Sequence, residues 1–402
     1  MFRRRSIKVC REGIYYLLVL IFVVGGATLQ DINLLFVLAG LMIGPLIYNW
    51  RMASLSVRWL AMRRVLPEYA FAGQPFRVEI EGENLRYRMG SWMLVIEDFI
   101  ESDPAEDNPI SGIRIKAGAI IAYLGAKQVE RTSYQLTLPR RGRYRFGPLL
   151  VSTRFPLGLV KATARLPQSR RMIVGPKLGT LTPQWLQLMD SRRFGRQQAQ
   201  YRQGPIDGDY YGLREWRAGD SKRWIHWRTA AKLGQLAVRQ FEQQQDRDLA
   251  LILDLWAPGS PSDEQRGNVE LAVSLTATVI NHLTRRARSH LTVCFAARPP
   301  RTWSSRATAV FGRQMMERLA MARASSNDSL SDLLNSVVLK MPSGARVLVI
   351  STRSDELNRL QQSGEYSGKM RHQSALSQVN WIDVGAPQLD LIFQLPSQVD
   401  AP

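Results

Sequence analysis

Cysteine and histidine are scarce in this sequence. Among 402 residues there are two cysteines, Cys10 and Cys294, and four histidines. Two distant cysteines cannot form the disulfide framework of a small secreted fold, and none of these residues has the spacing of a zinc site. The composition therefore excludes a disulfide scaffold, disfavours a metal hydrolase or a cysteine protease, and gives no reason to expect a cofactor.

Charged residues are missing from two stretches near the N-terminus. Residues 14–29 and 33–50 contain no Lys, Arg, Asp or Glu, and each approaches the ~20 residues needed to cross the hydrocarbon of a bilayer. Basic residues flank the pair on both outer sides: Arg3, Arg4, Arg5, Lys8 and Arg11 before it, and Arg51, Arg58, Arg63 and Arg64 after it. By the positive-inside rule, the sequence predicts a transmembrane helical hairpin in the cytoplasmic (inner) membrane, with both termini in the cytoplasm. A cleaved signal peptide is disfavoured because a second apolar stretch follows and residues 25–27 make a poor cleavage site.

Acidic residues are outnumbered by basic ones. The chain has 54 Lys and Arg against 34 Asp and Glu, a formal net charge of +20. This charge favours anionic partners, either nucleic acid or an anionic membrane leaflet. No nucleic-acid recognition motif is present, and the densest arginine clusters flank the apolar stretches, where the positive-inside rule explains them. We therefore expect contact with membrane lipid and no specific nucleic-acid partner, with binding to an anionic surface as an alternative function.

The middle of the chain has the alternation of half-buried strands. Residues 76–81 alternate between apolar and charged side chains, and the segments 92–98, 133–138 and 143–151 are short and rich in β-branched or aromatic residues. We predict a membrane anchor over 1–64, a β-sandwich-like domain over 65–165 and a linker over 166–203. No acid pair, nucleophile or glycine-rich loop stands out in the β-rich part.

The C-terminal part alternates apolar strands with amphipathic helices. Residues 249–256 predict a buried parallel strand, followed by a helix that Ser262 and Gln265 begin as a capping box. Further strands are expected at 290–297, 345–352 and, last, 378–386, with helices near 310–324 and 329–341. This pattern predicts a doubly wound α/β domain. Ligands of such sheets bind at the carboxyl ends of the strands, which directs attention to Asp254 and to residues 351–355.

Tryptophan, arginine and acidic residues are interleaved most densely over 204–247. Ser221 is predicted to cap a helix that carries Trp224, Trp227 and Ala231 and ends at Gly234, with a strand over 235–241. Trp224 and Trp227 are expected to anchor a local core. Bidentate arginine–carboxylate pairs are expected within one set of residues: Asp209, Glu215, Asp220, Glu242, Arg214, Arg217, Arg223, Arg228 and Arg239.

Residues 214–239 follow the pattern R-E-W-x-x-G-D-x-x-R-x-I-x-W-x-x-x-A-x-x-G-x-L-x-V-R. This pattern resembles the signature of the family called domain of unknown function 58. The order of the parts resembles that family over nearly the whole chain, including the stretch over 141–162. The candidate signature or partner-binding residues are Arg214, Glu215, Trp216, Gly219, Asp220, Arg223, Trp227 and Arg239.

The resemblance implies a von Willebrand factor A-like fold for 204–402 and a role beside MoxR-type AAA+ ATPases. A von Willebrand A domain holds a divalent metal with the motif D-x-S-x-S, whose carboxylate and hydroxyl oxygens suit Mg²⁺. The matching residues here are Asp254-Leu255-Trp256-Ala257-Pro258, which keep the acid and lose both hydroxyls. Asp254 remains a weak candidate Mg²⁺ ligand. Ser260, Ser262 and Asp355 could supply further oxygen ligands, but their spacing is not that of the motif. We therefore expect a metal-free relative of the fold, in which Asp254 caps a helix or fixes a loop.

These features together favour a membrane-anchored cytoplasmic adaptor or scaffold that is not an enzyme. Its protein partner is expected to be a MoxR-type AAA+ ATPase or a client of that ATPase, as the family resemblance implies. The alternative from another class is a metal-dependent enzyme of unknown reaction, with a site near Asp254 and the carboxylates of the signature. Such an enzyme needs a base, a nucleophile or metal and a charge stabiliser in one pocket, and the sequence shows only unassigned carboxylates and arginines.

Overall fold

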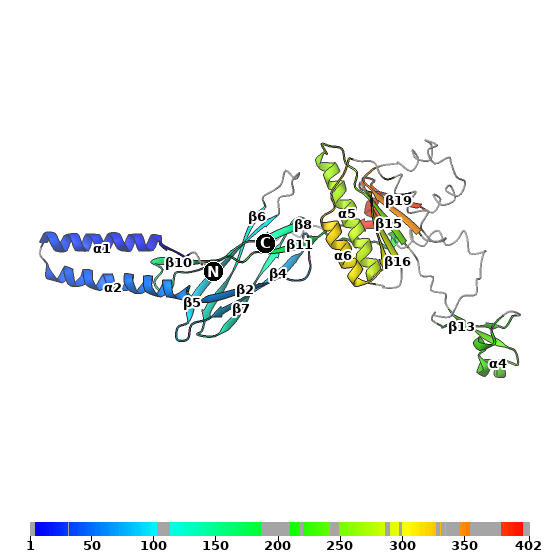
Figure 1. Cartoon of the computed structure of the whole chain (residues 1–402), viewed down its shortest axis with the longest axis horizontal. Coiled ribbons are helices and arrows are strands. Elements are labelled where there is room, and N and C mark those ends of the chain that lie inside the picture. Colours follow the sequence, from blue (N-terminus) through cyan, green and yellow to red (C-terminus); the bar gives the residue numbers. More distant parts are fainter. Residues whose placement is uncertain are drawn as a thin grey trace. The chain divides into compact units, whose positions relative to one another are not determined.

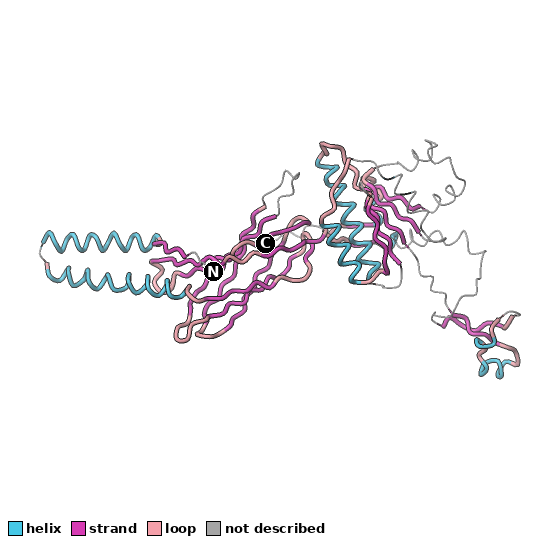
Figure 2. The backbone as a smooth tube through the Cα atoms, viewed as in Figure 1, coloured by secondary structure: helices cyan, strands magenta, loops and turns pink. Residues whose placement is uncertain are grey.

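The chain is multidomain, with two N-terminal apolar helices, then β-rich sheets, then a mixed and mostly parallel α/β sheet (Figures 1 and 2). The computed structural model describes residues 5–30, 32–102, 113–185, 210–217, 220–241, 249–285, 290–296, 300–326, 330, 334, 346–353 and 379–396. The chain divides into two compact units. One comprises mainly residues 1–178 and the other mainly residues 179–396.

The two N-terminal helices are α1 (Arg11–Gln30) and α2 (Asn33–Ser56). Both are long and apolar enough to span a membrane, with mean hydropathies of 1.9 and 1.5. Their large apolar side chains, Phe22 and Leu41 among them, are mostly exposed. The helices lie side by side (Figure 1), and the Tyr16 hydroxyl on α1 donates a hydrogen bond to the Met42 carbonyl on α2 (2.8 Å).

Two sheets make up the β-rich part of the first unit. The larger has the order β1-β10-β9-β5-β8-β11-β3, with β6 beside β5, and the smaller has the order β2-β4-β7. The larger sheet contains β1 (Arg5–Val9), β3 (Ala70–Phe71), β5 (Ser91–Ser102), β6 (Arg114–Leu124), β8 (Gly142–Phe146), β9 (Leu149–Thr153), β10 (Val160–Leu166) and β11 (Arg170–Gly175). The smaller contains β2 (Leu60–Val65), β4 (Pro75–Asn84) and β7 (Val129–Thr137).

The strands expected at 76–81, 92–98 and 133–138 are confirmed as parts of β4, β5 and β7. The single strand expected over 143–151 is wrong, because Gly147 and Pro148 separate β8 from β9. Six strands of this unit were not foreseen, namely β1, β2, β3, β6, β10 and β11. Strand β1 precedes the first helix, β2 lies at the end of the range assigned to the anchor, and β11 lies in the range assigned to the linker.

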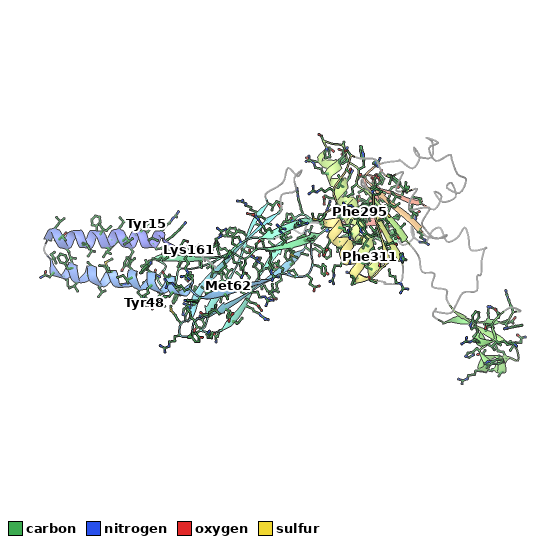
Figure 3. All side chains as sticks on the ribbon, viewed as in Figure 1. Tyr15, Tyr48, Met62, Lys161, Phe295 and Phe311 are labelled. Carbon is green, nitrogen blue, oxygen red and sulfur yellow. The ribbon has the colours of Figure 1, made fainter. Side chains whose placement is uncertain are left out.

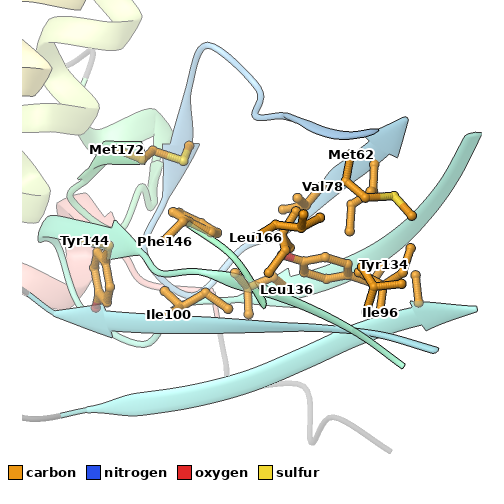
Figure 4. Packing of buried hydrophobic residues seen from close by; sticks show 14 of the residues in the cluster. Met62, Val78, Ile96, Ile100, Tyr134, Leu136, Tyr144, Phe146, Leu166 and Met172 are labelled. Atoms are coloured by element: carbon orange, nitrogen blue, oxygen red, sulfur yellow. The ribbon is translucent and has the colours of Figure 1, made fainter. Parts of the chain in front are cut away.

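One hydrophobic core is shared by both sheets (Figure 4). It includes Met62, Val78 and Leu136 from the smaller sheet and Ile96 and Phe146 from the larger. Alternation along each strand places these residues on its inner face. Burial of this kind stabilises the unit by about 25 cal/mol for each Å² of apolar surface removed from water.

A charged pair lies inside this core. The Arg64 guanidinium donates two hydrogen bonds to the Asp98 carboxylate (2.7 and 2.6 Å), and the two side chains are 1% and 0% exposed. The Tyr134 hydroxyl donates a third hydrogen bond to Asp98 (2.7 Å), and Arg64 also donates to the Gly147 carbonyl (3.0 Å). Burial raises the pKa of Asp98, and its contacts with Arg64 and Tyr134 oppose that shift. The pair links β2, β5 and β7 across the two sheets.

The two helices contact the β-rich part directly. The first strand β1 pairs antiparallel with β10, so that segments before α1 and after α2 lie in one sheet. The buried Asn49 side chain on α2 accepts a hydrogen bond from the Val160 backbone (3.1 Å). Ala53 and Val57 form a small buried cluster with Ala162 and Ala164 of β10. The end of the helix pair and this edge of the sheet therefore form one body.

The second unit contains a five-stranded sheet in the order β17-β16-β15-β18-β19. Its strands are β15 (Leu249–Asp254), β16 (His290–Phe295), β17 (Arg301–Arg306), β18 (Arg346–Ser351) and β19 (Val379–Asp383). All neighbours pair in parallel except β17, which runs antiparallel to β16. The helices α5 (Asp263–Thr284) and α6 (Ala309–Ala320) lie side by side (Figure 1). The capping box of Ser262 and Gln265 at the start of α5 is confirmed.

Two expectations for this unit need correction. Strand β17 was not predicted, because its side chains are polar and mostly exposed, as in a loop. The segment expected as the last strand, 378–386, is followed by α10 (Leu389–Ile392) and by β20 (Phe393–Gln394), which pairs with β12 (Thr180–Leu181). Most of the helix expected at 329–341 lies outside the described residues. Its described members Leu330 and Leu334 are buried in the core of the sheet.

Candidate functional site

The signature residues form a compact hairpin, here called the signature hairpin (residues 210–217 and 220–241). Strands β13 (Tyr210–Glu215) and β14 (Ala237–Phe241) pair antiparallel, with Glu215 opposite Ala237. Between them lie the 3-10 turn η2 (Lys222–Trp224) and the short helix α4 (Trp227–Leu233).

The helix of the hairpin starts later than the sequence suggested. Ser221 precedes only the turn η2 and makes no side-chain cap, and Ile225 is extended and bridges to Val238 of β14. The chain therefore cannot continue as helix from Ser221. Helix α4 begins after His226, whose ring nitrogen Nδ1 accepts a hydrogen bond from the Thr229 backbone N–H (3.3 Å). Its predicted end is confirmed, because Gly234 has the left-handed φ of 66° that suits glycine after a helix.

One predicted arginine–carboxylate pair fixes the turn of the hairpin. The Arg214 guanidinium donates two hydrogen bonds to the Asp220 carboxylate, both 2.6 Å. The Arg217 backbone N–H also donates to Asp220 (2.8 Å), and the Trp216 indole N–H donates to the Asp220 carbonyl (3.3 Å). These contacts, first of all the hydrogen bond from Arg214, lower the pKa of Asp220 to about 2. Arg214, Trp216 and Asp220 therefore act together as a scaffold of the hairpin.

The Asp220→Asn substitution is expected to loosen the hairpin without unfolding the rest of the chain. A neutral amide cannot accept both guanidinium hydrogen bonds as strongly as a carboxylate does. The readout is faster backbone hydrogen exchange within 213–238, with Glu215→Gln, a change at an exposed acid at the end of β13, as the control. Because the pKa of Asp220 is lowered in the fold, its pairing stabilises the hairpin above the ordinary aspartate pKa and is lost as the pH falls through about 2. Equal exchange in both variants would contradict this role.

The two tryptophans of the helical part have different environments. Trp224 is half-buried and packs with Trp216 against a small core of Ile225, Ala230 and Val238. Trp227 is 65% exposed, so the expectation that it anchors the core is wrong. Trp227 is the first residue of α4, at its open N-terminal end, whereas Ala230 lies one turn further on and is buried against Ile225 and Val238.

The outward side of α4 carries an aromatic residue beside two cations. Trp227, Arg228, Ala231 and Lys232 are all exposed and lie within one arc of the helix, and this set is called the exposed helix face. Arg223 is exposed on the turn before it. Gly219, Asp209, Glu242 and the side chain of Arg239 lie outside the described residues, so the structure leaves their predicted roles as predictions.

Besides the signature hairpin, a cluster of polar side chains lies where β15 and β18 end. Strand β15 has β16 on one side and β18 on the other, so the chain order reverses here, as at the ligand-binding crevice of doubly wound sheets. Asp254, at 2% exposed, accepts hydrogen bonds from the Ser351 hydroxyl (2.8 Å) and the Arg353 guanidinium Nε (3.0 Å). The Arg353 guanidinium also lies over the Trp256 ring, 5.4 Å from its centroid. Asp254 therefore fixes the loop after β18.

These residues do not fit a bound Mg²⁺. The Asp254 carboxylate already holds the fixed positive charge of Arg353, and the Ser351 hydroxyl proton is directed at the same carboxylate. Ser262, one of the nearby hydroxyls, accepts the capping hydrogen bond from the Gln265 backbone (3.2 Å). No group of three or more His, Cys, Asp or Glu that could hold a metal ion is found among the residues that the structure describes. The sequence pattern indicates Asp254 and this loop, but it does not single out Arg353. The position of Arg353, two residues after the end of β18, is the feature that could have identified it.

No curated protein matches the chain. Similar solved structures include a beta-glucosidase from Listeria innocua in complex with glucose (15% identity, TM-score 0.21, 29% of this chain and 16% of that chain). A CARDB domain from Pyrococcus furiosus in complex with di-metal ions has 15% identity and a TM-score of 0.18, over 27% of this chain and 85% of that one. The C-terminal domain of wzt has 11% identity and a TM-score of 0.22, over 30% of this chain and 72% of that one. The chain thus spans only 16% of the glucosidase, and TM-scores this low carry no argument about fold or function.

A family model matches the part of the chain that contains the signature hairpin and the residues around Asp254. Residues 212–377 include most of the signature hairpin, the strands β15 to β18, and Asp254 with Arg353. They match the family described as protein of unknown function DUF58, and this chain therefore contains a domain of that family over residues 212–377.

Proposed function

We propose that the protein is a membrane-anchored cytoplasmic adaptor that binds a protein partner through the exposed helix face of its signature hairpin. The observation that supports this proposal is that some signature residues hold the hairpin together while others are exposed. Arg214, Trp216 and Asp220 are engaged with one another, whereas Trp227 and Arg228 are exposed on a short, well-capped helix. Tryptophan and arginine are the residues most enriched at the energetic centres of protein interfaces.

The anchor consists of α1 and α2 as a pair of spanning helices. Both helices expose large apolar side chains along their length, which water disfavours and lipid accommodates. The pairing of β1 with β10 supports an even number of crossings, because segments before and after the helices share one sheet and so lie on one side of the membrane. The basic residues on that side favour the cytoplasm.

The adaptor part has a von Willebrand factor A-like fold, and the β-rich part is a sandwich. The strand order β17-β16-β15-β18-β19, with a single antiparallel strand at the edge, supports the first assignment. Two sheets around one core support the second. In the adaptor part the Arg353 guanidinium stands at the carboxylate where the fold would otherwise hold a divalent metal. The domain thus binds its partner without a bound metal ion.

The partner is a MoxR-type AAA+ ATPase or a client of that ATPase, as the family resemblance implies. Arg228 and Lys232, which lie beside Trp227 on the same arc of α4, favour a partner surface with an apolar pocket next to acidic residues. We propose no enzymatic activity. The charged groups that approach a possible reaction centre, Asp254 and Arg353, satisfy each other instead of facing a substrate.

The test is a comparison of bound proteins after gentle solubilisation of tagged full-length chain from its membrane. The variant is Trp227→Ala/Arg228→Glu, and the matched control is Leu157→Ala/Arg170→Glu, which changes one exposed apolar and one exposed basic residue of the β-rich part. An AAA+ ATPase or a defined client is expected with the parent and the control, and at least tenfold less with the variant. Since exposed residues are changed, unaltered hydrogen exchange in the hairpin serves as the check of folding. Equal recovery from all three proteins, or no reproducible partner from the parent, would contradict the proposal.

A further inference from the structure

Several loops of the β-rich unit meet at the end where the two helices enter it. They are the residues around 10 and 57–59, the β4–β5 loop at 85–90, the β6–β7 loop at 125–128 and the β9–β10 loop at 154–159. Backbone hydrogen bonds connect them: Cys10 to Leu159 (2.9 Å), Leu85 to Trp59 (2.9 Å) and Lys127 to Arg86 (3.1 Å). Figure 3 labels Tyr15, Tyr48 and Lys161 at this junction of helices and sheet. The loops therefore surround the base of the helix pair.

Exposed aromatic side chains lie on these loops and at the adjoining ends of β5 and β6. Trp59 is 64% and Tyr87 82% exposed, and Trp92 and Tyr123 are also exposed. Trp92 and Tyr123 are in contact, with their ring centroids 4.2 Å apart. Tryptophan and tyrosine on a water-exposed surface are unusual in such number, whereas they are enriched where a protein meets lipid headgroups.

Backbone strain is concentrated at the same place. Among the described residues, positive φ in a residue other than glycine occurs at three positions, Trp59 (53°), Met93 (48°) and Lys127 (57°). All three side chains are exposed, so internal packing does not explain why the fold holds them in this conformation. Strained residues of this kind persist where the surrounding structure enforces them, and they cluster at functional sites.

The charge of these loops is of one sign. Arg58, Arg88, Lys127 and Arg154 are exposed, and the Lys127 ammonium lies 3.9 Å from the centroid of the Tyr87 ring. No Asp or Glu occurs within residues 49–65, 84–93, 124–129 or 153–161, and the nearest acids in the chain are Glu12, Glu83 and Glu130. A cluster of cations beside aromatic rings matches a surface of phosphate groups above an apolar layer.

We propose that this basic-aromatic collar binds the headgroups of anionic phospholipids and seats the β-rich unit on the membrane surface. The collar comprises Arg58, Trp59, Tyr87, Arg88, Trp92, Tyr123, Lys127 and Arg154. The inference rests on the proposed spanning of α1 and α2, since it is the helices that place this end of the unit at the headgroups. Trp59 and Tyr87 enter the interfacial layer, and the cations pair with lipid phosphate. The collar then holds this end of the β-rich unit in contact with the membrane surface.

The test uses full-length protein in bilayer nanodiscs of phosphatidylcholine with phosphatidylglycerol. The lipid that stays bound after transfer to mild detergent is counted by native mass spectrometry. The variant is Arg88→Glu/Lys127→Glu/Arg154→Glu, and the control is Arg77→Glu/Arg143→Glu/Arg170→Glu, with the same change of charge on strands away from the collar. Retention of phosphatidylglycerol is expected to fall at least tenfold in the variant and to stay within a factor of two in the control. Equal retention in variant and parent would overturn the proposal.

A second substitution separates this role from folding. Lys127→Gly removes one cation and relieves one strained backbone position, so it is expected to raise the melting temperature in detergent and to lower the retention of phosphatidylglycerol. A fall in both quantities would identify a merely structural role and overturn the proposal. Extraction with alkaline carbonate distinguishes a failure of the anchor. Release of the parent protein from membranes would contradict the proposal that α1 and α2 span the membrane. If the parent stays in the membrane and the variant still retains phosphatidylglycerol as the parent does, only the proposed role of the collar is contradicted.

Discussion

The Asp98→Ala substitution is expected to destabilise the β-rich unit by about 3–5 kcal/mol, which is the cost of breaking a buried ion pair by removing one partner. The Arg64 guanidinium would stay in the core with a full positive charge, because it is 1% exposed and cannot lose its proton. The Tyr134 hydroxyl would lose its acceptor as well. Unfolding of the full-length protein in urea, followed by circular dichroism of the β-rich signal, measures the effect.

The control for this prediction is Glu101→Ala on the same strand. Glu101 pairs with Arg145 (2.8 Å) at the surface, where water screens the ion pair, so its loss is expected to change the stability little. The triple variant Arg64→Met/Asp98→Leu/Tyr134→Phe removes every member of the network together and is expected to be within about 2 kcal/mol of the parent, since a packed apolar replacement can match a buried pair. The buried Arg64 Nη1 atom, which has no hydrogen-bond partner in the described structure, makes the native pair less than ideal. A cost below about 1 kcal/mol for Asp98→Ala would show that the pair is not needed to hold the two sheets together.

The Arg353→Ala substitution is expected to cost about 3 kcal/mol in the α/β unit, because the Asp254 carboxylate would be left buried and without its counter-charge. The surface variant Arg266→Ala, which breaks the exposed pair with Asp263, is expected to cost about 0.5 kcal/mol or less and is the control. Thermal unfolding, followed by the fluorescence of the tryptophans, reports the difference.

The same experiment with added Mg²⁺ tests the assignment of Arg353 as the resident cation. The melting temperature of the parent is expected to stay unchanged up to millimolar Mg²⁺, because a ligand stabilises a fold only by binding it. A stabilisation that grows with Mg²⁺ concentration in the parent would show that the carboxylate is open to a metal, and the metal-dependent alternative would then regain support.

Elements with a strong local pattern could be predicted from the sequence. The two apolar helices follow from charge-free stretches, β4 follows from the alternation of 76–81, and α5 follows from its capping box. Strand β1 could not be predicted in this way. Its five residues are all exposed and basic in part, and what makes them a strand is pairing with β10, more than 150 positions away in the chain. Strand β17 was missed for a similar reason, since its side chains have no apolar face.

The candidate site was predicted in its composition and only partly in its geometry. The Arg214–Asp220 pair could be foreseen because both residues lie close together in one short segment. The exposure of Trp227 could not, because it depends on where α4 begins, and that is set by the bridge between Ile225 and Val238. The contact of Arg353 with Asp254 joins residues 99 positions apart and depends on the neighbouring ends of β15 and β18. The family match itself covers residues 212–377, a narrower range than the nearly complete resemblance expected from the sequence.

The most direct test of the adaptor account is crosslinking inside living cells. A photoreactive phenylalanine derivative is placed at position 227 of the full-length chain, and at position 170 as the control, and the captured proteins are identified by mass spectrometry. The account predicts that position 227 captures an AAA+ ATPase or one defined client, that position 170 does not, and that Arg228→Glu abolishes the product. Capture of the same proteins from both positions, or of none from position 227, would contradict the claim that the exposed helix face is where the protein binds its partner.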